Sequence, residues 1–320
     1  MIPNYELQLG ETKLDLTQNN DLEDLNLQVS MDTPADIFTA VIRANDDLAD
    51  LKTGDPATIK LGYDSELQDS FSGNIDTLQA GYDRLRVVGL GQTVKLLRLR
   101  VNQVYLKQTA GAIVKDLCSQ SKVPTGDIED GVSLPSFVVT HDVPAYEYVK
   151  ALAARSGYDV YFTTENNLAF KAYSPEKTHD LEYGLDILQV ESAKSSPPES
   201  VKIYGESPSS VRGSDTSHWL TKDSVEGSAG SGLTIPFSDP AVRDKDTANA
   251  VAKSRLAHSR HKIHVGILAL GSPEIKLGDA VSLKGMDHDL LKGDFKVRAV
   301  EHSLSKSSGF LTRLFCSREV

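Results

Sequence analysis

The chain has 320 residues, enough for two or three domains, and a net charge of −11. An acidic chain offers no basic surface for gripping nucleic acid, and no apolar run approaches the roughly 20 residues that cross a bilayer. We therefore expect neither specific nucleic-acid binding nor membrane insertion, and the absence of a basic, apolar leader at the start predicts a protein made in the cytoplasm.

Residues 1–104 are predicted to form a small antiparallel β-barrel. Apolar and polar residues alternate with the period of a half-buried strand in the stretches 5–9, 13–16, 25–29 and 37–44. A further meander follows Lys52-Thr-Gly-Asp55 and continues to about residue 90. Several strands of this kind are enough to close a barrel and remove its exposed edges.

Residues 105–189 are predicted to form a small α/β module. Thr109 is the candidate N-cap of a first helix, and Pro144 stands near the first position of a second helix, where its missing N–H costs nothing. Gly157 is placed to end this second helix with a left-handed cap. A hairpin of aromatic and apolar residues follows over 159–173.

Residues 190–320 are predicted to form a second β-barrel. The segment contains a strand near 200–205, a long Ser- and Gly-rich loop over 206–232 and an amphipathic helix over 246–261. The only tryptophan, Trp219, lies in the loop and is expected either to pin the loop to the body or to anchor a partner. A closing meander of three alternating strands ends the chain.

The two predicted barrels share a sequence pattern. Lys276-Leu-Gly-Asp279 repeats the Lys-x-Gly-Asp of residues 52–55, and each is followed by an alternating strand. Phe71 lies as far beyond Gly54 as Phe295 lies beyond Gly278. We interpret this as an internal duplication, although Gly-Asp turns are common enough for coincidence to remain an alternative. The predicted fold is mainly β, with two similar antiparallel barrels flanking an α+β insertion.

No catalytic, cofactor-binding or metal-binding residue is predicted. His258, His261 and His264 are three residues apart, but the segment containing His264 alternates like a strand, so its ring should point elsewhere. The Gly-Ser-Gly at 230–232 lacks the strand–turn–helix setting of a catalytic serine. Cys118 shares a helical face with apolar residues, which favours a place in the core.

The order of these segments resembles one known family. The pattern includes Phe71-Ser-Gly-Asn-Ile75, the helix 146–157 with its aromatic hairpin, Leu277-Gly-Asp279 and the closing strands 297–302 and 309–313. It is similar to the phage late control protein D family, the baseplate hub of contractile tails, and to the hub part of type VI secretion spike proteins and R-type bacteriocin hubs. The resemblance covers nearly the whole chain, and it rests on order and spacing rather than on one motif.

The resemblance implies a structural protein without enzymatic activity. It implies a homotrimeric ring of quasi-sixfold symmetry, which adapts a hexameric tail tube to a trimeric spike and is assembled into a tail baseplate or tail-like particle. The implied partners are further copies of the chain, a trimeric spike carried on a separate chain, the tail tube or its initiator and other baseplate proteins. DNA or cargo would pass the channel without specific binding. A tail-associated cell-wall hydrolase and a carbohydrate-binding β module remain alternatives.

Overall fold

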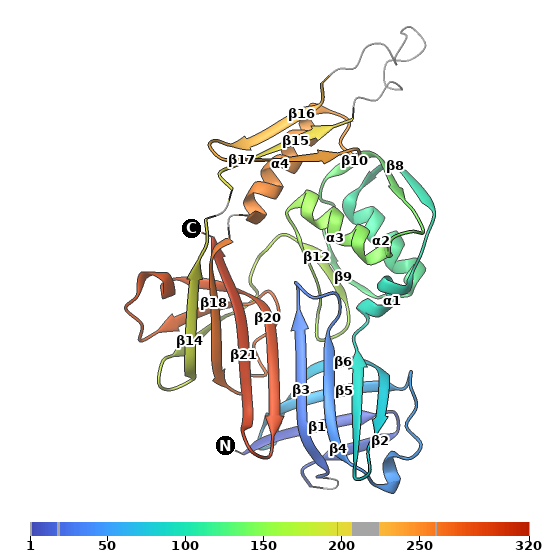
Figure 1. Cartoon of the computed structure of the whole chain (residues 1–320), viewed down its shortest axis with the longest axis vertical. Helices are drawn as coiled ribbons and strands as arrows, with labels where there is room; N and C mark the ends of the chain where they lie inside the picture. The colour runs from blue at the N-terminus through green and yellow to red at the C-terminus, as the bar shows by residue number, and fades with distance from the viewer. Residues whose placement is uncertain (1, 18–19, 197, 207–223, 260, 320) are drawn as a thin grey trace.

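The computed structural model describes residues 2–17, 20–196, 198–206, 224–259 and 261–319, with only the backbone described at 261 and 262. These residues lie mainly in strands, with a few helices inserted between them (Figure 1). The predicted fold class, mainly β with an α+β insertion, is confirmed. No helix in the described part of the chain is long and apolar enough to cross a membrane.

The N-terminal strands form a unit that we call the first half. They are β1 (Pro3–Leu9), β2 (Thr12–Asp15), β3 (Leu22–Ser30), β4 (Ile37–Arg43), β5 (Pro56–Tyr63), β6 (Glu66–Ala80) and β7 (Arg84–Leu90), with a 3-10 turn η1 (Asp46–Leu48). Antiparallel pairing orders them β3-β4-β7-β6-β5-β1-β2. Alternate residues such as Leu7, Phe38 and Ile59 point inward and are fully buried in one core.

A second half is built from strands in the C-terminal part of the chain. They are β13 (Thr178–Glu182), β14 (Ile187–Lys194), β18 (His261–Leu270), β19 (Ala280–Lys284), β20 (Asp294–Ser305) and β21 (Gly309–Glu319), with a 3-10 turn η3 (Asp289–Leu291). Their order is β14-β18-β21-β20-β19-β13. Ile267, Phe295 and Leu314 lie in a separate core.

The two halves have the same strand order. Each strand of the second half has a counterpart in the first half: β14 corresponds to β3, β18 to β4, β21 to β7, β20 to β6, β19 to β5 and β13 to β1. The counterparts occur in the same order in the sheet, and also in the same order along the chain. One pair differs in direction, because β13 runs parallel to β19 whereas β1 runs antiparallel to β5. A shared topology of this extent supports the internal duplication.

The halves are joined edge to edge. β20 pairs antiparallel with β3, so that one hydrogen-bonded path runs from β14 through both halves to β2 (Figure 1). Leu304 and Phe310 of the second half lie in the core of the first half, and Met31 of the first half lies in the core of the second. The halves therefore share one continuous sheet wrapped around two cores, while closure into two barrels stays a prediction.

The α/β module lies above the first half in Figure 1. Its elements are α1 (Thr93–Arg98), β8 (Gln103–Thr109), α2 (Ala110–Ser121), β9 (Thr125–Ile128), β10 (Ser133–Val139), α3 (Ala145–Ser156), β11 (Asp159–Phe162) and β12 (Leu168–Lys171). The Thr109 hydroxyl accepts a hydrogen bond from the Ala112 N–H at 3.2 Å, and Gly157 ends α3 with φ +71°, which confirms both predicted caps. Pro144 is the N-cap itself, one residue before the predicted position.

A small sheet with its own helix is inserted in the second half. β15 (Ser200–Gly205), β16 (Glu226–Gly230) and β17 (Thr234–Asp239) pair in the order β16-β15-β17 and pack against α4 (Lys245–Ser259). The segmentation therefore differs from the expected one in three ways. The range 190–320 is not a single β unit, the range 206–232 contains β16 rather than only a loop, and β13 and the start of β14, expected in the module, pair within the second half.

Candidate assembly site

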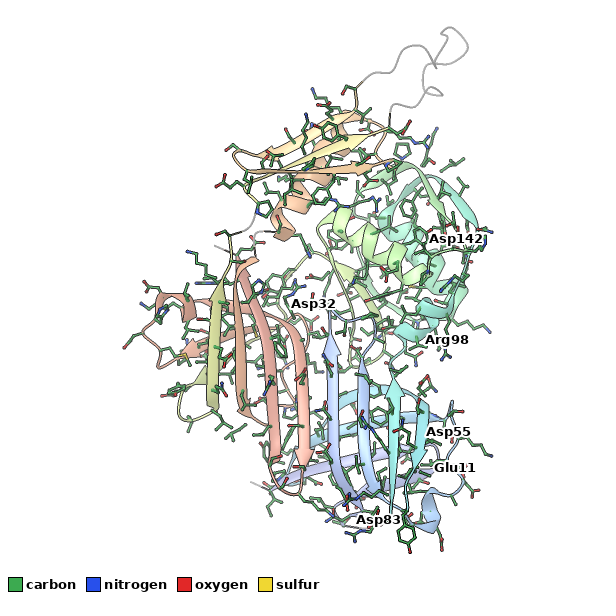
Figure 2. The ribbon with its side chains drawn as sticks, in the orientation of Figure 1. Glu11, Asp32, Asp55, Asp83, Arg98 and Asp142 are labelled. Atoms are coloured by element: carbon green, nitrogen blue, oxygen red, sulfur yellow. The ribbon has the colours of Figure 1, made fainter. Side chains whose placement is uncertain are left out.

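The joint between the halves is built from apolar and ionic contacts. Seven cross-strand pairs connect β20 with β3, from Ala299 opposite Ser30 to Ser305 opposite Asp24. Arg298 binds Asp32 at the upper end of the joint, where Figure 2 labels Asp32. Burial works to raise the pKa of Asp32, but the hydrogen bonds and the charge of Arg298 outweigh burial and hold that pKa below its usual value.

The Lys-x-Gly-Asp motifs form matching turns in the two halves. The Asp55 carboxylate accepts the Lys52 N–H at 2.9 Å, and the Asp279 carboxylate accepts the Lys276 N–H at 3.1 Å. Both glycines have positive φ, +96° at Gly54 and +85° at Gly278, a conformation that glycine adopts without strain. The predicted equivalence of these two turns is seen in their hydrogen bonds.

Backbone hydrogen bonds extend this equivalence into the next strand. The Gly54 N–H donates to the Ile75 carbonyl at 2.7 Å, and the Gly278 N–H donates to the Val297 carbonyl at 3.1 Å. Ile75 therefore corresponds to Val297. The expected equivalence of Phe71 with Phe295 is wrong by two residues, because 13 residues separate the paired Thr58 and Ser72, whereas 11 separate the equivalent pair Ser282 and Asp294.

The α/β module is fixed to the second half by a buried ion pair. Lys296 of β20 binds Asp159 of β11, and its ammonium lies 4.8 Å from the centre of the Tyr173 ring. Both charged side chains are more than nine-tenths buried. Burial lowers the pKa of Lys296, although Asp159 works in the opposite direction. Alternation alone places Lys296 on a solvent face, so only the covering module reveals its role.

A second buried ion pair fixes the small inserted sheet to the module. Arg155 of α3 binds both carboxylate oxygens of Asp239 with contacts of 2.7 and 2.9 Å, and its guanidinium lies 5.5 Å from the centre of the Phe137 ring. Asp239 also accepts the Ala241 N–H at 3.2 Å. The bidentate geometry sets the orientation of the small sheet relative to α3.

A cavity of about 160 Å³ lies where the first half, the β11–β12 turn and the second half meet. Asp36 and His302 are in its wall. Burial raises the pKa of Asp36 to about 7, against the effect of the Ser30 N–H that donates to it at 3.0 Å. Burial also lowers the pKa of His302 to about 4, and the Nδ1 atom of this ring lies 2.9 Å from the Thr312 hydroxyl.

The three histidines considered from the sequence form no metal-binding group among the described residues, although His258 and His264 line one groove. His258 is on α4, where two grooves of about 810 and 550 Å³ meet, and burial lowers its pKa. His264 is exposed on β18, which confirms the predicted strand, and the side chain of His261 lies outside the described residues. No group of three metal-ligating side chains occurs in the described part of the chain.

The other residues considered from the sequence have structural settings. Gly230 ends β16 with φ +82°, so the Gly-Ser-Gly is a strand-to-strand turn rather than a helix entry. Cys118 and Cys316 are buried free thiols, and burial raises the pKa of each to about 12. Trp219 lies outside the described residues.

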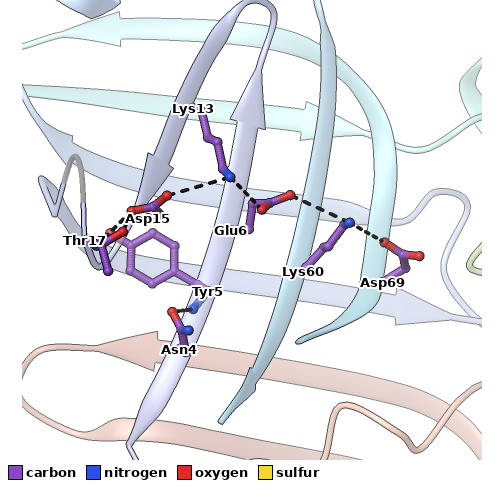
Figure 3. Close-up of polar contacts among 8 residues, drawn as sticks. All are labelled: Asn4, Tyr5, Glu6, Lys13, Asp15, Thr17, Lys60 and Asp69. Carbon is purple, nitrogen blue, oxygen red and sulfur yellow. Dashed lines mark hydrogen bonds and ion pairs between the residues drawn. The ribbon is translucent and has the colours of Figure 1, made fainter. Parts of the chain in front are cut away.

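A group of carboxylates lies on the outside of the first half, across β1, β2, β5 and β6 (Figure 3). Lys13 binds Glu6 at 2.8 Å, and Lys60 lies 3.7 Å from Glu6 and 3.8 Å from Asp69. The hydrogen bond from Lys13 is the main cause of a lowered Glu6 pKa. Charges alternate across the strands, which is the pattern of a cross-strand ladder and not of two carboxylates sharing a proton.

No protein-family model matches this sequence, and no curated protein matches it either. Solved structures do match. The prophage MuSo2 43 kDa tail protein from Shewanella oneidensis has a TM-score of 0.75 at 13% identity, covering 99% of this chain and 98% of that one. The chain has the fold of a phage tail protein.

Two further matches agree with this fold. The tail protein from Neisseria meningitidis MC58 has a TM-score of 0.74 at 15% identity, covering 99% of this chain and 97% of that one. The E. coli c3393 protein, a component of the type VI secretion system with structural similarity to the T4 bacteriophage tail proteins gp27 and gp5, has a TM-score of 0.62 at 12% identity. That match covers 97% of this chain and 76% of the c3393 chain.

Proposed function

We propose that this tail-protein fold serves as a structural hub in a contractile tail or related injection device. In this proposal three copies form a ring between a hexameric tail tube and a trimeric spike, as the resemblance to the late control protein D family implies. The chain acts by position and docking and catalyses no reaction. Support comes from the tail proteins that share its fold over nearly their whole length.

The observation that carries the proposal is the duplicated half. One chain contains two units that have the same strand order and matching Lys-x-Gly-Asp turns. Three copies then present six similar units around a threefold axis. Such a ring can face a sixfold tube on one side and a threefold spike on the other, because it contains both symmetries.

Electron microscopy of the assembled particle tests this function. We expect density for three copies around the axis, between tube and spike. Six copies, or one copy away from the axis, would contradict the proposal. A monomer in dilute solution is compatible with it, since contacts with tube and spike add stability to the ring by mass action. Release of soluble fragments from peptidoglycan by the purified chain would instead support the hydrolase alternative.

A further inference from the structure

Each strand of the β20–β3 joint has a counterpart in the other half of the chain, and these two counterparts, β6 and β14, do not pair with each other. β20 and β6 occupy the same place in their halves, and each carries a register shift at the same point, at Arg298 in β20 and at Asp76 in β6. Beyond the shift, β20 pairs with β21 on one side and with β3 on the other. After its register shift, over residues 77–80, β6 pairs only with β7 among the described strands. The opposite edge of residues 77–80 therefore carries no strand.

The counterpart of β3 is open in the same way. β14 takes the place of β3 in the second half and pairs with β18. Its other edge carries no strand in the described part of the chain, and most of its residues are exposed. An open edge presents unpaired N–H and C=O groups that can accept a further strand. The chain therefore has two open edges, one along β14 at an end of the continuous sheet path and one along residues 77–80 of β6 within that path.

We propose that β14 of one copy pairs antiparallel with residues 77–80 of β6 in the next copy and so repeats the β20–β3 joint between molecules. This inference rests on the proposed ring and names the contact that closes it. Six halves would then follow one another around the axis, with joints inside a chain and joints between chains in alternation. Each joint would turn the sheet by about 60° in a closed threefold ring.

The register of this joint follows from strand pairs in the two halves. Thr77 in β6 and Ala299 in β20 are equivalent, because each directly follows the register shift of its strand. The residues paired with Thr77 across β7 and β4 lead to Asn26 in β3. The residues paired with Ala299 across β21 and β18 lead to Glu191 in β14, so Asn26 and Glu191 are equivalent. Inside the chain Val300 lies opposite Val29, and Glu301 lies opposite Gln28. The corresponding pairs between copies are Leu78 opposite Lys194 and Gln79 opposite Ala193.

The faces of the two edges agree in this register. Leu78 packs partly against the core of the first half, and Lys194 lies opposite the buried Ile263, so both point to the core side. Gln79 and Ala193 are exposed and point to the outer side. A slip by one residue would place core-facing positions opposite outer-facing ones, which a half-buried sheet does not tolerate.

The open edge of β14 is also more polar than the edge of β3 in the closed joint. Lys194 and Ser192 stand where β3 has Val29 and Leu27. An edge lysine keeps a lone strand from pairing with unrelated edges, and its aliphatic stem can still cover the neighbouring Leu78 once the ring forms. The edge thus suits a contact that is exposed to water before assembly.

Cysteine pairs test the register directly. In the double variant Gln79→Cys, Ala193→Cys, side chains directly opposite one another would have Cβ atoms about 4.5–5.5 Å apart, within reach of a short bismaleimide and, at the short end of that range, of a disulfide. Mild oxidation should give covalent dimers and closed trimers on a denaturing gel, with no larger species. The native Cys118 and Cys316 are buried and should not take part. Each single variant serves as a background control.

A shifted pair is the matched control. In Gln79→Cys, Ser192→Cys the two thiols would lie on opposite faces of the sheet, and we expect at least about tenfold less trimer. Equal cross-linking by both pairs, or none by the 79/193 pair in a sample that native mass measurement shows to be trimeric, would overturn the joint while the ring stands. A wild-type chain that forms no trimer, alone or with tube and spike, would contradict the ring itself and the joint with it.

Discussion

The paired Lys-x-Gly-Asp turns allow one prediction with an internal control. Asp55 and Asp279 make the same hydrogen bond to the backbone of the lysine three residues earlier, but their surroundings differ. Asp55 is half-buried and lies on the first half in Figure 2. Asp279 is 5% exposed, and a carboxylate oxygen lies 2.9 Å from Nε2 of His179 on β13. Replacing each aspartate with alanine compares one turn with and without the added contact.

Asp279→Ala should lower the free energy of unfolding more than Asp55→Ala does, and the difference between them should exceed the contribution of the shared turn hydrogen bond. Loss of the shared hydrogen bond costs about 1 kcal/mol of unfolding free energy. Asp279→Ala also removes the charge-assisted contact and leaves the mostly buried His179 ring without that partner, which adds about 2 kcal/mol. We therefore expect a loss of about 1 kcal/mol for Asp55→Ala and about 3 kcal/mol for Asp279→Ala.

Urea unfolding, followed by fluorescence and circular dichroism together, measures both losses. Asp50→Ala, an exposed position close to Asp55, should stay within about 0.5 kcal/mol of the wild type. Equal losses for Asp55→Ala and Asp279→Ala would refute the role given to His179. A negligible loss for both would refute the view that the aspartate holds the turn.

Other predictions concern the buried groups. Asp239→Ala should leave Arg155 buried without its partner, cost about 3 kcal/mol or more and speed amide exchange in α4, whereas unchanged exchange would argue against the pair as the link to α3. A chromogenic thiol reagent at pH 8 should leave Cys118 and Cys316 unmodified until the protein is unfolded, and rapid reaction of the folded chain would contradict their burial. The pKa of His302 is lower in the folded protein than in the unfolded chain, so on acidification the unfolded chain binds the proton at a higher pH. Acidification from pH 6.5 to 4 should therefore lower the free energy of unfolding of the wild type by about 3 kcal/mol, a loss that a His302→Gln variant does not show. The pKa of Asp36 is raised rather than lowered, so the effect of pH has the opposite sign: a rise from pH 4 to 7 should cost the wild type about 3 kcal/mol that Asp36→Asn does not lose. Parallel curves of stability against pH for variant and wild type would refute either assignment.

The local features of the fold could be predicted because each depends on a short stretch of chain. Alternation in the sequence places residues such as Leu7 and Ile59 on the inner face of their strands, and the structure buries both. The side-chain oxygen of Thr109 accepts a hydrogen bond from a backbone N–H in the first turn of α2. Gly157 has no Cβ and therefore adopts, without strain, the left-handed conformation that ends α3. The matching Gly-Asp turns belong to the same class of local signal.

The arrangement of the strands could not be predicted in this way. β20 and β3 lie at opposite ends of the chain, and nothing in the alternation of either strand says which edge it meets. Lys296 has the alternation of an exposed residue, and only contact with Asp159 and Tyr173 of the module shows that it is buried. The small sheet of β15–β17 was missed because β16 is a five-residue strand containing two glycines in a Ser-rich stretch, which has little strand propensity of its own.

The closed and open joints differ in a way that fits the order of assembly. The β20–β3 joint forms as the chain folds, and its strand edges are paired in the native state, so it can hold Leu27, Val29 and Leu304 on its inner face. The proposed joint between copies stays exposed until a second copy arrives, and an apolar edge there would invite unspecific pairing. Replacing Lys194 with valine, the residue of β3 at the equivalent place, should therefore stabilise the ring and also promote aggregation of the free chain. Light scattering and native mass measurement on Lys194→Val would show both effects, and tighter trimers without aggregation would mean that the lysine does not guard the edge.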